Sequence, residues 1–298
     1  MSKIIVGVDL SAESERAVAH AVAVARHVGW ELLLVLVDTV PEPPEGAPES
    51  MRMIAERYTA TLTARLDGHR RQLAALRERW IGHGIALSQL IVDGFADERL
   101  PAVASEVGAE LIVVGSHGRS GVKRFLLGSV AEHVTRRADQ SVLVARGDAP
   151  DGGYRRVVIG TDFSAAGEPA LGRALPLIAR GGHIHLVHCW QQPWVLIFGE
   201  PVGVLPADDE LQAAIGRSLA EAAEGIRARL RPDRPDIELT SELVPALPAQ
   251  GLVEAAAAHQ ADLVVVGSHG RRGVRRFVLG SVAEVTLRHA PCSVLVAR

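Results

Sequence analysis

The chain is poor in cysteine and in aromatic residues. Among its 298 residues only Cys189 and Cys292 are cysteines, and 4% are aromatic. So few cysteines argue against a disulfide framework and favour a reducing compartment, the cytoplasm. Aliphatic residues are plentiful, so a core can be built largely without aromatic side chains.

Long apolar runs and a strong net charge are also missing. The apolar runs have the length of strands, far short of the roughly 20 residues that cross a bilayer. The first residues follow a strand pattern instead of the basic and apolar segments of a signal peptide. A net charge of −3 gives no general attraction for nucleic acid or an anionic membrane. We therefore expect a cytoplasmic protein without nucleic-acid or membrane partners.

Two familiar phosphate-binding motifs are absent. The chain has no G-x-x-x-x-G-K-[ST], which excludes a P-loop. No G-x-G-x-x-G follows the first apolar run of either half, so the dinucleotide fingerprint is missing too. A phosphate site in this chain needs a different loop.

The chain does contain a long internal repeat. Residues 115–146 align with residues 267–298 without a gap and agree at 23 of 32 positions. Both copies carry G-x2-G-x9-G-S, as Gly115, Gly118, Gly128 and Ser129, and as Gly267, Gly270, Gly280 and Ser281. The length also suits about two domains. We predict domains at 1–147 and 153–298, joined by a polar, glycine-bearing linker.

Apolar strand patterns alternate with helical patterns in both halves. We predict strands at 3–9, 31–38, 86–92, 110–115 and 141–145, then at 155–162, 183–190, 237–243, 262–267 and 293–297. Helices are predicted at 13–28, 50–83, 96–108 and 129–138, then at 166–180, 207–230, 249–260 and from 281. This alternation predicts an α/β fold in each half, with a parallel sheet covered on both faces.

Ligands of such sheets bind at the carboxyl ends of the strands. Asp9 and Gly115 lie at such ends in the first half, and Asp162 and Gly267 do so in the second. The glycines suit tight turns and let backbone amides approach a ligand, and Gly128–Ser129 begins a helix whose free N–H groups favour an anion. The Ser129 hydroxyl can cap that helix or bind a phosphate oxygen.

The alternative for this loop is a structural turn followed by a helix cap, but two intact copies favour phosphate binding. The basic residues in the loop can neutralise phosphates or belong to a solvated surface; they are Arg119, Lys123 and Arg124 in one copy and Arg271, Arg275 and Arg276 in the other.

With GVDLS at 7–11, GTDFS at 160–164 and two complete G-x2-G-x9-G-S motifs, the chain resembles the universal stress protein family over its whole length. The resemblance implies two tandem Rossmann-like domains, each a five-stranded parallel sheet in the order 3-2-1-4-5. It also implies ATP, alone or with Mg²⁺, held by the glycine loop with the adenine near the ends of the first two strands.

The resemblance also assigns residues to this site. Asp9 and Asp162 match the acidic position after the first strand, and Leu36 and Cys189 match the position bordering the adenine. The loop positions are Gly115, Gly118, Arg119, Gly128, Ser129 and Val130, and in the second half Gly267, Gly270, Arg271, Gly280, Ser281 and Val282. The final strands match the edge through which such domains pair, which implies a pseudo-dimer within the chain and a homo-oligomer.

The second half departs from the family pattern after its third strand. The first half has Gly94 in IVDG, whereas the second has Ala246 in LVPA. The methyl group of Ala246 narrows the nucleotide pocket of the second half. We therefore expect ATP binding to be more secure in the first half than in the second.

Other polar residues carry less weight. His183 and His185 share one face of a strand and His188 points to the other, so with Cys189 they suit variable strand-edge positions better than a zinc site. Trp190 and Trp194 are expected in a loop. Ser116 and His117 are neighbours in a tight loop, and we expect them not to face one another as a nucleophile and a base.

The sequence therefore favours an ATP-binding protein that regulates partner contacts. A slow ATPase or nucleotidyl-transfer enzyme on the same fold is the alternative. A structural module without nucleotide is a third hypothesis, which the intact glycines oppose.

Overall fold

The computed structural model describes residues 2–38, 48–118, 127–163, 168–190, 194–197, 200–204, 209–268 and 279–298. The chain forms two compact units, Met1–Ala149 and Pro150–Arg298.

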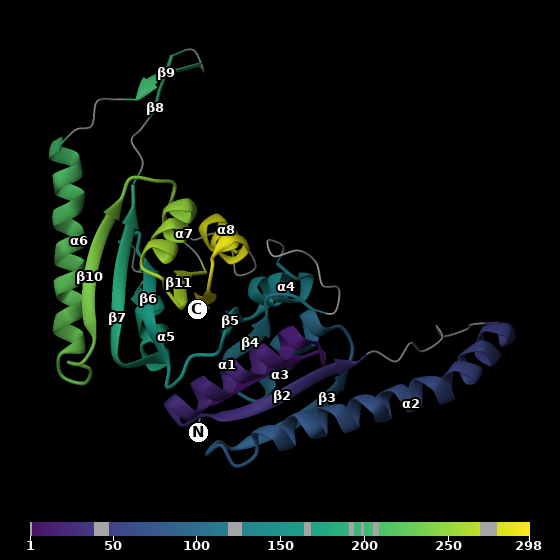
Figure 1. Ribbon diagram of the computed structural model, residues 1–298. Helices are drawn as coiled ribbons and strands as arrows, with labels where there is room; N and C mark the ends of the chain where they lie inside the picture. Colours follow the sequence, from purple (N-terminus) through teal and green to yellow (C-terminus); the bar gives the residue numbers. More distant parts are fainter. Residues whose placement is uncertain are drawn as a thin grey trace. The chain divides into compact units, whose positions relative to one another are not determined.

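The first unit is built on parallel strands. In its described residues these are β1 (Lys3–Val8), β2 (Glu31–Asp38), β3 (Leu87–Asp93), β4 (Ala109–Gly115) and β5 (Ser141–Ala145). They are ordered β3-β2-β1-β4-β5, and every pair between neighbours is parallel (Figure 1). The order reverses direction at β1, so β1 and β4 flank the switch point, where ligands of such sheets bind.

In the described part of this unit, four helices connect these strands: α1 (Ala12–Val28), α2 (Glu49–Trp80), α3 (Ala96–Glu106) and α4 (Ser129–Arg137). Ser11 caps α1, because its side chain accepts a hydrogen bond from the Ser14 amide, and Gly29 ends it with a left-handed φ of 70°. The long α2 runs beside β2 and β3 (Figure 1). These connections bring the ends of β1, β2 and β4 to one edge of the unit.

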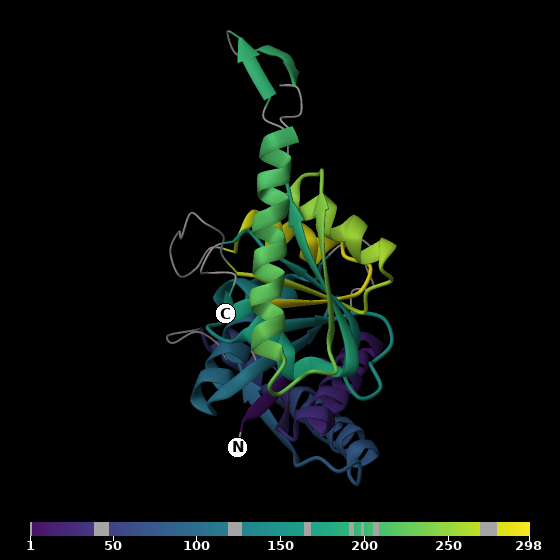
Figure 2. The same ribbon diagram turned by 90° about the vertical axis from the view of Figure 1, so that its left-hand side faces the viewer.

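The second unit repeats this plan. Its parallel strands are β6 (Tyr154–Gly160), β7 (Ile178–Cys189), β10 (Glu238–Val244), β11 (Leu263–Gly267) and β12 (Ser293–Ala297), ordered β10-β7-β6-β11-β12. Its helices are α5 (Glu168–Ala174), α6 (Asp209–Leu230), α7 (Pro248–Ala258) and α8 (Ser281–His289). Figure 2 shows α6 alongside β10.

The predicted fold class is confirmed: the chain is a tandem of α/β units with parallel sheets and helices on both faces. The central strands are mostly apolar, and Ile4, Ile5 and Val6 of β1 are fully buried. Burial on both faces explains why these strands read as continuous apolar runs. Within the described ranges, none of the helices combines the length and apolarity needed to span a bilayer.

The helix predicted at 166–180 is present as α5, but its predicted end at residue 180 is wrong. In the described residues α5 ends at Ala174, a short 3-10 turn covers Leu175–Leu177, and β7 begins at Ile178. Pro176 has no amide hydrogen to continue an α-helix. The pairing of β6 with β7 shifts register between Tyr154 and Arg156, which accommodates the early start of β7.

A small hairpin was also missed. β8 (Trp194–Ile197) pairs with β9 (Glu200–Val204) in antiparallel fashion, where the sequence suggested a loop at Trp194. The proline and polar residues around it gave no alternating strand pattern.

Candidate functional site

A cavity of about 450 Å³ lies at the carboxyl ends of the strands in the first unit. Ligand pockets generally occupy about 300–1,000 Å³, so this one suits a small molecule. Its walls come from β1, α1, β2, α2, α3, β4 and the start of α4. The lining residues are Gly7, Val8, Asp9, Ser14, Val35, Val37, Asp38, His69, Ala96, Leu100, Val114, Gly115, His117, Gly118, Gly128, Ser129, Val130 and Ala131. The predicted residues Asp9, Gly115, Gly118, Gly128, Ser129 and Val130 therefore border one cavity.

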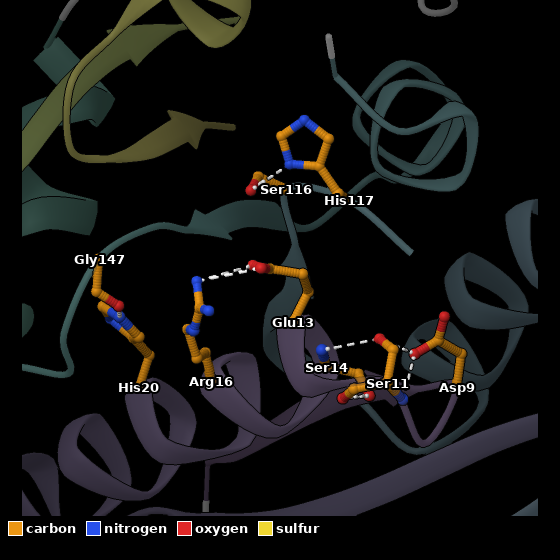
Figure 3. Close-up of polar contacts among 9 residues, drawn as sticks. All are labelled: Asp9, Ser11, Glu13, Ser14, Arg16, His20, Ser116, His117 and Gly147. Carbon is orange, nitrogen blue, oxygen red and sulfur yellow. Dashed lines mark hydrogen bonds and ion pairs between the residues drawn. The ribbon is translucent and has the colours of Figure 1, made fainter. Parts of the chain in front are cut away.

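Asp9 is held in place by the start of α1. Its Oδ1 accepts hydrogen bonds from the Ser11 amide at 3.0 Å and from the Ser11 hydroxyl at 2.5 Å, while Ser11 Oγ also accepts from the Ser14 amide (Figure 3). The helix cap and the carboxylate are thus one hydrogen-bonded unit. This arrangement fixes Asp9 at the cavity wall.

The glycine loop approaches Asp9 and α1 so closely that little room is left for a side chain. A Cβ at Gly118 would lie 3.0 Å from Asp9 Oδ2, and a Cβ at Gly115 would lie 3.0 Å from the Glu13 carbonyl oxygen. Contacts this short are tighter than nine in ten real Cβ contacts, so the neighbouring atoms would have to shift. Glycine is therefore favoured at both positions, where the loop approaches the aspartate and the helix at this edge of the sheet.

The start of α4 closes the same side of the cavity. Gly128 is its N-cap, with no side-chain cap hydrogen bond, and the Gly128 amide donates to the Ser116 carbonyl at 2.8 Å. Ser129 is the first helical residue, so of its two predicted roles the helix cap is wrong. Val130 is 40% exposed and borders the cavity. The first amides of α4, and the positive end of its dipole, are available to an anion.

The opposite side of the cavity is mainly apolar. Val35 and Val37 of β2, with Ala96 and Leu100 of α3, form this wall. The predicted Leu36 is 1% exposed, and its two neighbours line the cavity in its place. Alternate residues of a strand face opposite sides of the sheet, which explains this difference.

Sequence analysis missed two polar residues on this apolar side. Asp38, the last residue of β2, accepts from His69 Nδ1 at 2.6 Å and from Arg65 Nη2 at 3.0 Å. Asp38 and His69 both line the cavity, and their side chains are 11% and 16% exposed. The sequence contains one indication of these polar residues. The helix α2 carries polar residues at positions where the corresponding helix of the second half, α6, carries apolar ones.

The second unit closely reproduces the start of α4 in α8. Gly280 is the N-cap, with φ −62° and ψ 145° against −63° and 143° for Gly128. Its amide donates to the Ser268 carbonyl at 2.9 Å. Gly267 ends β11, Ser281 and Val282 begin α8, and Asp162 follows β6 by two residues.

The first two strands of the second unit correct one predicted correspondence. Gly7 pairs with Val35 and Gly160 pairs with Val187, so the residue level with Leu36 is His188 and not Cys189. His188 Nδ1 is 2.7 Å from the Thr161 carbonyl oxygen, and its ring lies 4.3 Å from that of Phe163. Cys189 lies one residue further and corresponds to Val37.

Some predicted residues lie outside the described part of the chain. These are the loop residues Arg119, Gly270 and Arg271, together with Lys123, Arg124, Arg275 and Arg276.

The expectation that Ser116 and His117 do not face one another is wrong. Ser116 Oγ lies 2.9 Å from His117 Nδ1, and Figure 3 shows this pair apart from the hydrogen-bonded cluster of Asp9 and Ser11. Ser116 is buried, and its carbonyl holds the Gly128 amide. The bend at Ser116 and His117, directly after β4, brings the two adjacent side chains together.

The histidines of β7 form a stack. The rings of His183 and His185 are 4.0 Å apart, and His185 lies 3.8 Å from the ring of His259 at the end of α7. Burial, reinforced by His183 and His259, lowers the pKa of His185 to about 4. Within the described residues, no group of three or more His, Cys, Asp or Glu side chains is arranged to hold a metal ion. Parallel rings do not direct their nitrogens to one point.

Comparison with known proteins agrees with the fold and with the glycine motifs. The sequence profile of the Universal stress protein family matches residues 1–146 and again residues 153–298. The chain belongs to the universal stress protein family.

Full-length relatives support this assignment. A universal stress protein of Mycobacterium tuberculosis is 32% identical over 303 residues, covering 99% of this chain and 96% of the relative. One of Mycolicibacterium smegmatis is 30% identical over 308 residues, with the same two coverages. The crystal structure of a universal stress protein from Archaeoglobus fulgidus superposes with a TM-score of 0.69 at 20% identity, covering 99% of this chain and 98% of that one. That likeness concerns the fold.

Proposed function

We propose that this universal stress protein binds ATP in the cavity of its first unit and regulates partner contacts according to its nucleotide occupancy. The main support for the proposal is that two sides of the cavity differ in polarity. One side combines the glycine loop with the start of α4, and the other is apolar. A nucleotide is divided in the same way, into anionic phosphates and a flat, largely apolar base.

The glycine side suits the ribose and phosphates. Backbone amides at the start of α4 have no side-chain cap, and a helix N-terminus attracts anionic oxygens. Asp9 accepts hydrogen bonds, so its carboxylate suits a hydroxyl donor such as those of ribose. Phosphates carry their own Mg²⁺ in many nucleotide sites, with few protein ligands. The metal proposed with ATP is therefore held chiefly by the nucleotide.

The apolar side suits the adenine. Val35, Val37 and Leu100 offer flat apolar contact, and burying an aromatic base there is favourable. Gly94 directly follows β3, and IVDG there fits the pattern that the family often has after its third strand. The second unit has the same helix start at Gly280, and we propose a second, weaker nucleotide site there.

A slow ATPase is the second candidate function. The contact of Ser116 with His117 is the specific observation in its favour, because a histidine adjacent to a serine hydroxyl is one element of nucleophilic or general-base catalysis. The pair lacks a third group of the kind that orients a catalytic base within the described residues, so regulation remains the first proposal.

One experiment tests both functions. Protein incubated with ATP and Mg²⁺ is freed of unbound nucleotide by gel filtration, denatured, and the released ligand is identified by mass spectrometry. Recovery of intact ATP supports the regulatory function, and recovery of ADP with steady phosphate release supports the enzyme. Absence of any adenine nucleotide, together with no heat on titration with ATP, contradicts both.

A further inference from the structure

His69 is the polar side chain that reaches the apolar side of the cavity from α2. Its Nδ1 lies 2.6 Å from Asp38 Oδ2, and Arg65 Nη2 lies 3.0 Å from Asp38 Oδ1. The two lining side chains, Asp38 and His69, are largely enclosed, at 11% and 16% exposed. The charge of the carboxylate is balanced by the guanidinium, so this wall carries a polar group without a net negative charge.

This contact fixes which nitrogen of the imidazole carries the proton. An ionised carboxylate only accepts hydrogen bonds, so His69 donates from Nδ1. In a neutral imidazole the other nitrogen, Nε2, is then a hydrogen-bond acceptor. Within the described residues, Nε2 of His69 has no hydrogen-bond partner. In this neutral form, Asp38 and Arg65 hold an unused acceptor at the wall of the cavity.

The described residues of the second unit hold no such group at the equivalent positions. Arg77 donates to the Leu87 carbonyl and Arg227 to the Leu239 carbonyl, which aligns α2 with α6. With that alignment His69 corresponds to Leu219. Leu219 is buried, at 3% exposed.

The other two members of the group are replaced as well. Arg65 corresponds to Ile215 by the same alignment, and Trp190 stands at the level of Asp38 by the strand register. All three polar residues of the first unit are thus apolar or aromatic in the second. Packing of α2 or α6 on the sheet does not require a polar trio.

We propose that His69 determines the base specificity of the first site, with Asp38 and Arg65 as positioning residues. The acceptor Nε2 selects a donor on the base, the exocyclic 6-amino group of adenine. A 6-oxo purine presents a carbonyl oxygen there, and two acceptors facing one another lose the hydrogen bond. The inference rests on the proposed ATP site. It implies that the second unit binds purine nucleotides equally well whether position 6 of the base carries an amino or an oxo group.

The test compares ATP with inosine triphosphate, which replaces the 6-amino group by a 6-oxo group. Hydrogen–deuterium exchange of peptides covering β4 and α4 reports binding to the first unit alone in the full chain. We expect the wild-type protein to bind ATP about tenfold more tightly than inosine triphosphate, the difference one hydrogen bond supplies. His69→Leu, which installs the residue found in α6, is expected to bring the two affinities within about twofold.

Arg70→Gln is the matched control. Arg70 is the next residue of α2, it is exposed, and it pairs with Asp67 away from the cavity. The tenfold preference is expected to persist in this variant. A preference that persists in His69→Leu as well overturns the inference.

Asp38→Asn gives a second, independent readout. The side-chain amide that this substitution introduces can donate to His69 Nδ1 while its oxygen accepts from Arg65, which moves the imidazole proton to Nε2. The preference is then expected to reverse in favour of inosine triphosphate, an outcome that a merely structural role of Asp38 does not produce. An unchanged preference for ATP in Asp38→Asn contradicts the role of the pair.

Different results would contradict the proposed nucleotide site and the proposed role of His69. If ATP does not protect the first unit at any concentration, the proposed function fails. If ATP and inosine triphosphate protect the wild-type unit equally, the nucleotide site stands and only the role of His69 is overturned.

Discussion

Leu10 and Phe163 follow the aspartate at the end of the first strand in their respective units, and both have a left-handed backbone, with φ of 63° and 60°. Non-glycine residues rarely adopt this conformation, which costs about 1–2 kcal/mol. Backbone strain of this kind concentrates at functional sites. Here it turns the chain from the strand into the next segment while keeping Asp9 at the cavity.

The first prediction concerns this turn. Leu10→Val is expected to lower the free energy of unfolding by about 1–2 kcal/mol, because β-branched residues tolerate positive φ worst. Leu10→Asn is expected to cost less, since asparagine enters the left-handed region readily. Urea denaturation measures both. Equal stabilities for the two variants would show that the turn is not strained.

The second prediction compares Gly94 with Ala246. Gly94 has φ 122°, and a Cβ there would lie 2.9 Å from Arg99 Cγ, whereas Ala246 is not among the residues with positive φ. Gly94→Ala is therefore expected to destabilise the first unit by about 1–3 kcal/mol. Ala246→Gly is expected to cost under about 1 kcal/mol, the entropic effect of glycine. Thermal unfolding of the two variants checks the order, and a larger loss for Ala246→Gly contradicts it.

These two positions show what the sequence could and could not predict. The spacing of Gly115, Gly118 and Gly128 predicted the start of α4 at Ser129, because close approach at these positions leaves little room for a side chain. The departure at Ala246 was visible as a residue type. The sequence did not show how this residue changes the backbone, because φ at one loop residue depends on the packing around it.

The residues that sequence reasoning misplaced depend on long-range packing. His69 is 31 residues from Asp38, and their contact exists because α2 lies against β2. The match of Leu36 with His188 follows from strand register, because Gly7 pairs with Val35 and Gly160 pairs with Val187. Ser116 and His117 face one another because of a turn whose dihedral angles no pattern of residue types specifies.

The third prediction concerns acid stability. The pKa of His185 is lowered from 6.5 to about 4, first by burial and then by His183 and His259. Between those pH values the unfolded chain binds more protons than the folded one, so the stability of the second unit falls as the pH drops from about 6.5 to 4. Above 6.5 this contribution is fully retained.

His185→Gln removes the titrating ring and is expected to flatten that dependence. Hydrogen exchange of β7 and β10 peptides at several pH values measures it in the second unit alone. Glu242, which pairs with His259 at 2.8 Å, opposes the shift and stays in place in this variant. An identical pH dependence in the variant would assign the effect to other groups.

The fourth prediction concerns Cys189. Burial, reinforced by the carboxylates of Glu242 and Glu254, raises the pKa of its thiol to about 11. Because the thiolate is the reactive form, alkylation by iodoacetamide at pH 8 is expected to be at least tenfold slower than for the unfolded chain. Peptide mass spectrometry after timed quenching locates the label. Labelling of Cys189 at the rate of the unfolded chain contradicts the assigned environment.

Binding of ATP in the cavity beside Asp9 and Gly118 is tested most directly by calorimetric titration of ATP into Gly118→Ala. The added methyl group would lie 3.0 Å from Asp9 Oδ2, so the variant is expected to lose the first unit's binding heat. Gly68→Ala, whose methyl group meets nothing within 4 Å, is expected to titrate like the wild-type protein. An isotherm of Gly118→Ala that matches the wild type, or a wild-type protein that gives no heat with ATP, contradicts the account.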